Sequence, residues 1–165
     1  MRYYLMLCGI ATSIIAVSAV APSASAQEMT ATYSCQNIGN AAPEQLGDRE
    51  GHAIEVNPYS CRIDSGPMSG GVDTGVAIWE WDKTNAVQIS ASAVERKPGS
   101  TLVYQGAGGT LALTMADGKV TGFTASGKGF WPVATGSAAA LAGKSATWTA
   151  KPTGPGQFSL EVKTQ

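Results

Sequence analysis

Short runs of alternating apolar and polar residues, separated by turn residues, recur along most of the chain. Such runs at intervals of about 8 to 12 residues are typical of an all-β sandwich or barrel. The one helix-like stretch, residues 136–145, is too short to be stable as a helix by itself. We therefore predict a single small antiparallel β-barrel of about eight strands. A barrel is favoured over a sandwich because closure removes exposed strand edges, and the 20 glycines permit tight bends.

A hairpin is predicted at Asp117-Gly118, which lies between two alternating runs. This dipeptide suits a two-residue type I′ turn, because both central residues must adopt positive φ. Pairing outward from the turn opposes three pairs on one face: Met115 to Val120, Leu113 to Gly122, and Leu111 to Thr124. Phe123 then falls on the other face, which either meets solvent or forms the wall of a lumen.

The segment Ile78-Trp79-Glu80-Trp81-Asp82 raises the question of which strand face is inward. In a strand, Trp79 and Trp81 share one face, and Glu80 shares the other with apolar residues. Apolar side chains on both faces indicate a strand that is covered on both sides, as in a closed barrel. The tryptophans either fill a core or line a cavity. Glu80 either reaches water or, if its face is inward, has its pKa raised by burial.

The following run, residues 86–94, is predicted to pair with the tryptophan strand as a hairpin. Strict alternation places Val87, Ile89, Ala91 and Ala93 on one face.

The N-terminus has the pattern of a secretory signal peptide over residues 1–26. Arg2 precedes an apolar run, and Ala24-Ser25-Ala26 matches an A-x-A cleavage site before Gln27. We therefore expect a periplasmic or secreted barrel domain, residues 27–165, with no membrane anchor after cleavage. Of the three cysteines, Cys8 lies in the signal segment, so Cys35 and Cys61 remain as the predicted disulfide.

Charge and motif content exclude several classes of function. The formal net charge is −1 and no basic cluster occurs, so neither nucleic acid nor an anionic membrane surface is an expected partner. His52 is the only histidine, which rules out a histidine-rich metal site, and no G-x-S-x-G or phosphate-loop motif accompanies it. We expect no cofactor and no metal. His52 follows Asp48 and Glu50 closely, which favours a hydrogen bond to a nearby carboxylate.

The segments GDREGHAI, SCR, DGKVTGFTASGKGF and AGKSATWTA together give a strand rhythm and glycine placement over residues 46–162. This pattern resembles small exported bacterial proteins of the allene oxide cyclase or dirigent-like barrel type. The resemblance implies an eight-stranded antiparallel barrel with a hydrophobic cavity, often in homo-oligomers. Plant members guide cyclisation or radical coupling of apolar substrates. Their catalytic residues have no matched positions here, so catalysis is not carried over.

Three functions remain open from the sequence. The first is binding of a small apolar or aromatic ligand in the lumen, with Trp79, Trp81 and Phe123 as wall residues and Glu80 as a polar anchor. The second is a cyclase or isomerase-like enzyme that uses Glu80 or His52. The third is a protein-binding or inhibitory module acting through loops such as residues 64–75. For the third, the opening ATYSCQN is similar to the Tyr-x-Cys start of small periplasmic lysozyme inhibitors.

Overall fold

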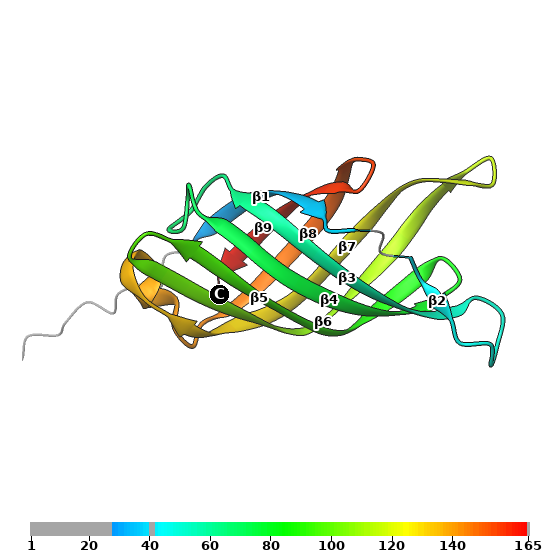
Figure 1. The fold of residues 1–165 in the computed structure, drawn as a ribbon, viewed down its shortest axis with the longest axis horizontal. Coiled ribbons are helices and arrows are strands. Elements are labelled where there is room, and N and C mark those ends of the chain that lie inside the picture. The colour runs from blue at the N-terminus through cyan, green and yellow to red at the C-terminus, as the bar shows by residue number, and fades with distance from the viewer. Residues whose placement is uncertain (1–27, 40–41, 165) are drawn as a thin grey trace, which may run out of the picture.

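The strands form one antiparallel sheet that closes on itself into a barrel of eight strands, with one short extra strand (Figure 1). The computed structural model describes residues 28–39 and 42–164. The predicted barrel is confirmed. The predicted signal peptide, residues 1–26, lies outside the described residues.

The elements follow one another as a meander from β3 to β9, and β1 closes the circle between β9 and β3. The short strand β2 pairs only with the beginning of β3. The bounds are β1 (Thr30–Asn37), β2 (Glu44–Gln45), β3 (His52–Ile63), β4 (Val72–Asp82), β5 (Asn85–Lys97), β6 (Ser100–Ala116), β7 (Lys119–Ala134), β8 (Ser145–Gly154) and β9 (Gln157–Thr164). A 3₁₀ helix, η1 (Gly136–Leu141), connects β7 to β8.

The predicted disulfide joins the two strands at which the barrel closes. Cys35 of β1 and Cys61 of β3 are direct register partners, with Cα atoms 3.9 Å apart, and their sulfur atoms are bonded. Both residues are buried on the inner face. The bond therefore fixes the β1–β3 pairing, the short ladder at which the barrel closes.

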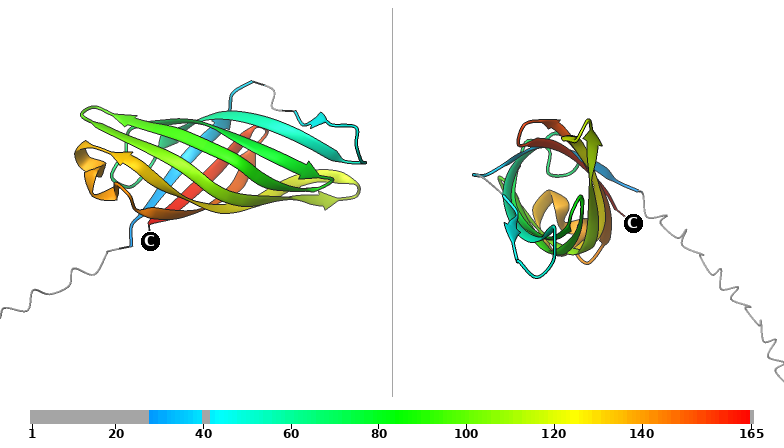
Figure 2. Two further views of the ribbon diagram at one scale, coloured as in Figure 1. Left: turned by 90° about the horizontal axis from the view of Figure 1, so that it is seen from below. Right: turned by 90° about the vertical axis from the view of Figure 1, so that its right-hand side faces the viewer.

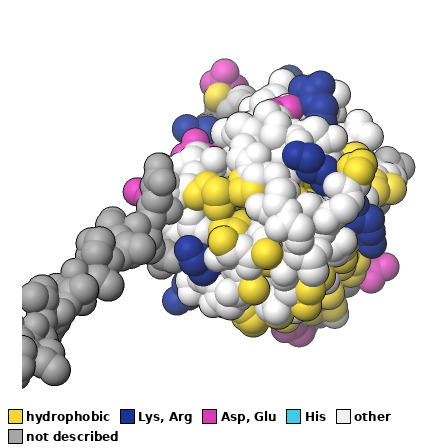
Figure 3. All heavy atoms as spheres, turned by 90° about the vertical axis from the view of Figure 1, so that its left-hand side faces the viewer, with side chains coloured by type: hydrophobic (Ala, Val, Ile, Leu, Met, Phe, Trp, Pro, Cys, Tyr) yellow, Lys and Arg dark blue, Asp and Glu magenta, His cyan; other side chains and the backbone are white. Residues whose placement is uncertain are grey.

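One end of the barrel is closed by its connections. Met68, in the loop between β3 and β4, and Leu141 of η1 are buried at this end together with Leu102 of β6. The loop and η1 are joined by a hydrogen bond that Ser137 Oγ donates to the Pro67 carbonyl, at 3.0 Å. Seen from this end, hydrophobic side chains gather near the centre, with lysine and arginine around them (Figure 3).

At the other end the strands run on to different lengths. The β6–β7 hairpin extends beyond the β8–β9 hairpin, so the rim of the barrel is oblique (Figure 1). A view from this end looks along the inside of the cylinder, with η1 at the far end (Figure 2). The β2 segment lies outside the ring, beside β3.

Alternation along the strands places small and aromatic residues inside. Trp79 and Trp81 of β4 face inward and are buried, whereas Glu80 between them faces outward. Phe158 and Leu160 of β9 also face the interior.

Two bulges overturn details that strict alternation predicted. Opposite the step from Ile78 to Trp79, β5 carries an extra residue, Ile89. Val87 and Ile89 are therefore exposed, while Ala91 and Ala93 are buried, so the prediction that all four share a face is wrong. A bulge reverses the facing of side chains beyond it because the period of a strand is two.

The second bulge lies next to the Asp117-Gly118 turn, between Thr114 and Met115. The turn is present and Met115 pairs with Val120 as predicted. Beyond the bulge, Leu113 pairs with Phe123 and not with Gly122, and Leu111 pairs with Ala125 and not with Thr124. The same shift turns Phe123 to the inner face, beside the leucines.

We predict that replacing both cysteines, in a Cys35→Ala/Cys61→Ala variant, lowers the free energy of unfolding by about 3 kcal/mol. The bond closes a loop with a sequence separation of 26 residues, so its loss restores conformational freedom to the unfolded chain. Urea denaturation of the variant and of the oxidised wild type measures the difference. Equal unfolding midpoints with equal slopes would contradict the role given to this bond.

Candidate functional site

A cavity of about 340 Å³ occupies the barrel interior. It extends from the tyrosines and acidic residues near the closed end to Phe123 and Val120 at the oblique rim. Val120 is more than half exposed, so the cavity reaches the surface at this rim. A volume of this size is at the lower end of the range for small-molecule sites, roughly 300 to 1,000 Å³.

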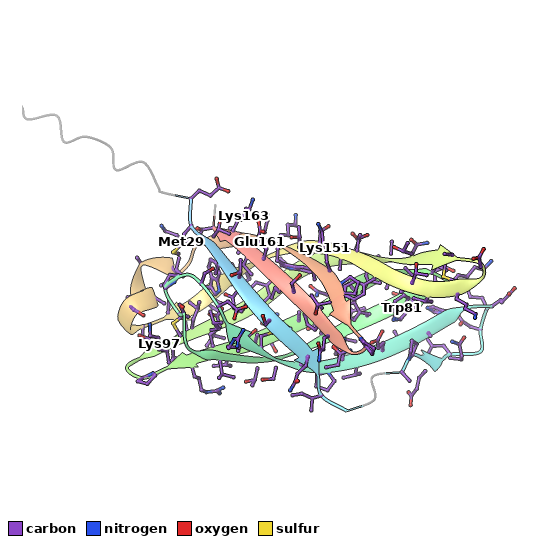
Figure 4. The ribbon with its side chains drawn as sticks, turned by 90° about the horizontal axis from the view of Figure 1, so that it is seen from above. Met29, Trp81, Lys97, Lys151, Glu161 and Lys163 are labelled. Carbon is purple, nitrogen blue, oxygen red and sulfur yellow. A yellow bond between two sulfur atoms is a disulfide. The ribbon has the colours of Figure 1, made fainter. Side chains whose placement is uncertain are left out.

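The middle of the cavity is lined by tryptophans. Trp79 of β4 and Trp148 of β8 meet edge to face, with ring centroids 6.4 Å apart and planes at 83°. Space for Trp148 comes from glycines on the neighbouring strands β6 and β7, because a Cβ at Gly109 or Gly127 would collide with the indole. Trp81 lies within the barrel, whereas Lys151 and Lys163 lie on the outer surface (Figure 4).

Glu55 brings a carboxyl group to the tryptophan wall. It lies on the inner face of β3, is 8% exposed, and accepts a hydrogen bond of 2.7 Å from Trp81 Nε1. Burial raises the pKa of Glu55, and the hydrogen bond from the indole opposes this rise. The indole N–H of Trp81 is thereby satisfied, and its ring is held against the cavity.

Two further carboxyl groups lie deeper, towards the closed end. Asp73 of β4 and Glu95 of β5 are direct register partners, and both side chains point inward, 3% and 4% exposed. Tyr33 of β1 donates a hydrogen bond of 3.1 Å from its hydroxyl to Glu95 Oε1. Like charges opposite one another on neighbouring strands repel, so this pair favours a state with fewer than two charges.

Burial is the main cause of the altered acidity of this pair. It raises the pKa of Asp73 to about 6. Burial, followed by the charge of Asp73, raises the pKa of Glu95 to about 8, against the opposing effect of the hydrogen bond from Tyr33. Burial and the charge of Glu95 also raise the pKa of Tyr33, which keeps its hydroxyl protonated as a donor.

The charge lining the cavity is of one sign. Glu55, Asp73 and Glu95 contribute carboxyl groups, and no lysine, arginine or histidine within residues 28–39 and 42–164 lines the cavity. Within the same ranges, no three His, Cys, Asp or Glu side chains gather closely enough to hold a metal ion. The arrangement is suited to holding an apolar molecule and to accepting hydrogen bonds from it at the deep end.

The sequence-predicted wall residues meet in this cavity, but the predicted polar anchor does not. Trp79, Trp81 and Phe123 all line it. Glu80 points away from the cavity, and it lines a second hollow together with Arg49 and residues of β5, β6, β7 and β8. The reason is the alternation itself, since a residue between two inward tryptophans must face outward.

Glu80 and His52, the two residues predicted for enzymatic chemistry, contact each other on the outside of the barrel. His52 Nε2 lies 2.9 Å from Glu80 Oε1, and His52 Nδ1 lies 2.6 Å from Asp48 Oδ1. Arg49 approaches Glu80 at 3.9 Å. The hydrogen bonds to Asp48 and then Glu80 raise the pKa of His52, and the bond to His52 lowers the pKa of Asp48. An imidazolium that donates to both carboxylates joins the 46–51 turn to β4.

Loop residues 64–75, predicted as a protein-binding surface, divide into two parts. Residues 64–71 form the connection that closes the barrel end, and Met68 within this connection is buried. From Val72 onward the segment belongs to β4, which is why Asp73 enters the cavity.

Sequence reasoning missed the acidic residues of the cavity. Asp73 is in phase with Trp79 and Trp81, an even number of residues away, but it lies within residues 64–75, which the sequence predicts as a loop. Glu95 is likewise in phase with Ala91 and Ala93. Extending the inward face of β4 back to residue 73 and that of β5 forward to residue 95, in steps of two residues, finds both carboxyl groups.

Comparison of the sequence with protein-family models and with curated proteins finds no match. None of the helices in the described part of the chain has the length and apolar character needed to cross a membrane.

We predict that the fold is less stable at pH 8 than at pH 5 because Glu95 must ionise inside the barrel. A carboxyl group with a raised folded-state pKa contributes stability at low pH that is lost as the pH rises through that value. For Glu95 the window runs from the ordinary value, 4.5, to about 8. Glu95→Gln should reduce this loss by about 3 kcal/mol.

Chemical denaturation at pH 5 and pH 8 measures the effect. Glu161→Gln is the matched control, because Glu161 is an exposed carboxylate on the outer face of β9. The control should keep the wild-type difference between the two pH values. A Glu95→Gln curve parallel to the wild type would show that Glu95 does not ionise in this range.

His52 should titrate above the ordinary histidine pKa of 6.5. Because it is the only histidine, its imidazole NMR signals identify it without ambiguity. Its two hydrogen bonds to carboxylates contribute stability that is full below the ordinary pKa and is lost as the pH rises through the raised one. Glu80→Gln should lower the midpoint, whereas Glu161→Gln should leave it unchanged. A wild-type midpoint at or below 6.5 would contradict the two hydrogen bonds.

Proposed function

We propose that this chain is an exported binding protein that takes up a small apolar or aromatic molecule into its barrel. The observation that carries the proposal is the tryptophan-lined cavity, which is closed at one end and reaches the surface at the other. Binding sites for small molecules are commonly concave, mostly apolar and largely preformed, with a few polar groups. The barrel mouth is a usual place for such a site.

Two features support export. The sequence of residues 1–26 has the pattern of a signal peptide. The Cys35–Cys61 disulfide suits an oxidising compartment, since cytosolic thiols are kept reduced. Membership of the allene oxide cyclase or dirigent-like group stays a prediction from strand rhythm and glycine placement.

A neutral hydrophobic dye, N-phenylnaphthylamine, provides the test. We expect its fluorescence to rise on binding and to saturate, with energy transfer from the cavity tryptophans. Ala77→Phe should weaken binding at least tenfold, because Ala77 lines the cavity and the added ring fills it. Ile78→Phe is the matched control, since its side chain on the same strand faces away from the cavity.

Circular dichroism and thermal melting establish that both variants keep the barrel. Unsaturable binding by the wild type, or equal affinity of the folded Ala77→Phe variant and the wild type, would overturn the proposal. Native mass spectrometry of protein from its own host gives an independent answer, because a retained small molecule adds a defined mass.

A further inference from the structure

We propose that the molecule held in the barrel is cationic, an apolar amine whose ammonium group sits between Asp73 and Glu95. This inference rests on the proposed function and assigns a ligand class to the same cavity. The apolar body of the amine would lie along Trp79, Trp81 and Trp148, between the acidic pair and the rim.

The acidic pair has unused hydrogen-bonding capacity. Asp73 Oδ1 and Glu95 Oε2 are buried and have no hydrogen-bond partner, although both side chains line the cavity. A buried acceptor without a donor costs free energy, and a buried carboxylate is usually paired with a cation. These two oxygen atoms therefore mark the place where a donor is needed.

The surrounding side chains do not supply the missing charge. The titratable groups that face the pair are Tyr33 of β1 and Tyr59 of β3, and both are neutral phenols because their pKa values are raised. Arg96, whose charge slightly lowers the pKa of Asp73, lies on the outer face of β5 and donates to Thr74 Oγ1 at 3.2 Å. A cation paired with the ionised carboxylates would therefore have to be the occupant of the cavity.

An ammonium group fits this place better than a metal ion or an anion. It offers three donors, whereas a metal ion needs a larger set of ligands than the described residues gather here. An anion would be repelled by the carboxylates. Aromatic walls favour the same choice, because ring faces attract cations and also cover the apolar part of an amine.

Binding of a cation is coupled to the protonation of the pair. The free protein keeps Glu95 largely protonated below its pKa of about 8 and Asp73 below about 6. An ammonium group favours the ionised carboxylates, so binding releases protons and tightens as the pH rises. An alkylamine remains protonated throughout this range, since its pKa is close to that of lysine, about 10.4.

Naphthylethylamine and naphthylethanol form a matched pair of probes that differ in charge and share the aromatic body. We expect the amine to bind at least about tenfold more tightly than the alcohol at pH 8, because charge-assisted hydrogen bonds are the stronger ones. The affinity of the amine should rise about tenfold or more from pH 5 to pH 8, and that of the alcohol should not rise. Isothermal titration calorimetry in two buffers of different ionisation enthalpy also counts the protons released.

Glu95→Gln removes one charge at nearly constant shape. It should reduce the preference for the amine over the alcohol to less than about threefold at pH 8. Glu161→Gln, on the outer face, should keep the full preference. If Glu95→Gln does not fold, the pH dependence of the wild type decides alone.

The outcomes separate this inference from the proposed function. Equal affinity for the amine and the alcohol at pH 8, or an amine affinity independent of pH, overturns the cationic ligand while the binding function stands. If neither probe nor the neutral dye binds, both proposals fall. Loss of the amine preference in Glu161→Gln as well as in Glu95→Gln would place the cation outside the cavity and overturn the inference.

Discussion

Closure of the sheet between β1 and β3 determines which side chains are enclosed. Only five residues of β1 pair with β3, and the Cys35–Cys61 bond lies at the centre of this short ladder. Without that pairing, the sheet from β3 through β9 to β1 would be open, with β1 and β3 at its two edges, and its inner face would be exposed to water. The cavity, the raised pKa values of its acids and the proposed binding function all depend on this seam.

The interior that closure creates is not optimised for stability alone. An interior filled with aliphatic side chains would be more stable than one holding Asp73 opposite Glu95. Yet the strands place the two carboxyl groups face to face, and one oxygen of each has no hydrogen-bond partner. Departures of this kind concentrate at functional sites, where the local cost is retained for an interaction that the free protein does not make. The tryptophan wall and the glycines that admit it supply the shape around this polar end.

The sequence predicted the architecture well because its signals were local. Alternating runs, turn residues and an isolated cysteine pair each act over a few residues or a known compartment rule, and together they indicated a closed barrel with a Cys35–Cys61 bond. The inward facing of single residues was less predictable, because it depends on where bulges occur. One extra residue at Ile89 separated the faces of Val87 and Ala91, and one near Thr121 placed Phe123 opposite Leu113. The contact between His52 and Glu80 joins two strands, so the spacing of the two residues in the sequence does not predict it. Asp73 was overlooked because a glycine-rich loop leads into β4 without a break in composition.

The buried plug at Met68 and Leu141 makes the barrel a blind tube. A ligand in such a tube keeps the orientation with which it entered, with its leading group at the closed end and its trailing group at the rim. It can leave only through the rim by which it entered. The rim then exposes only the trailing part of the ligand to the surroundings. Another molecule could therefore recognise the bound ligand only through the chemical groups of that trailing end.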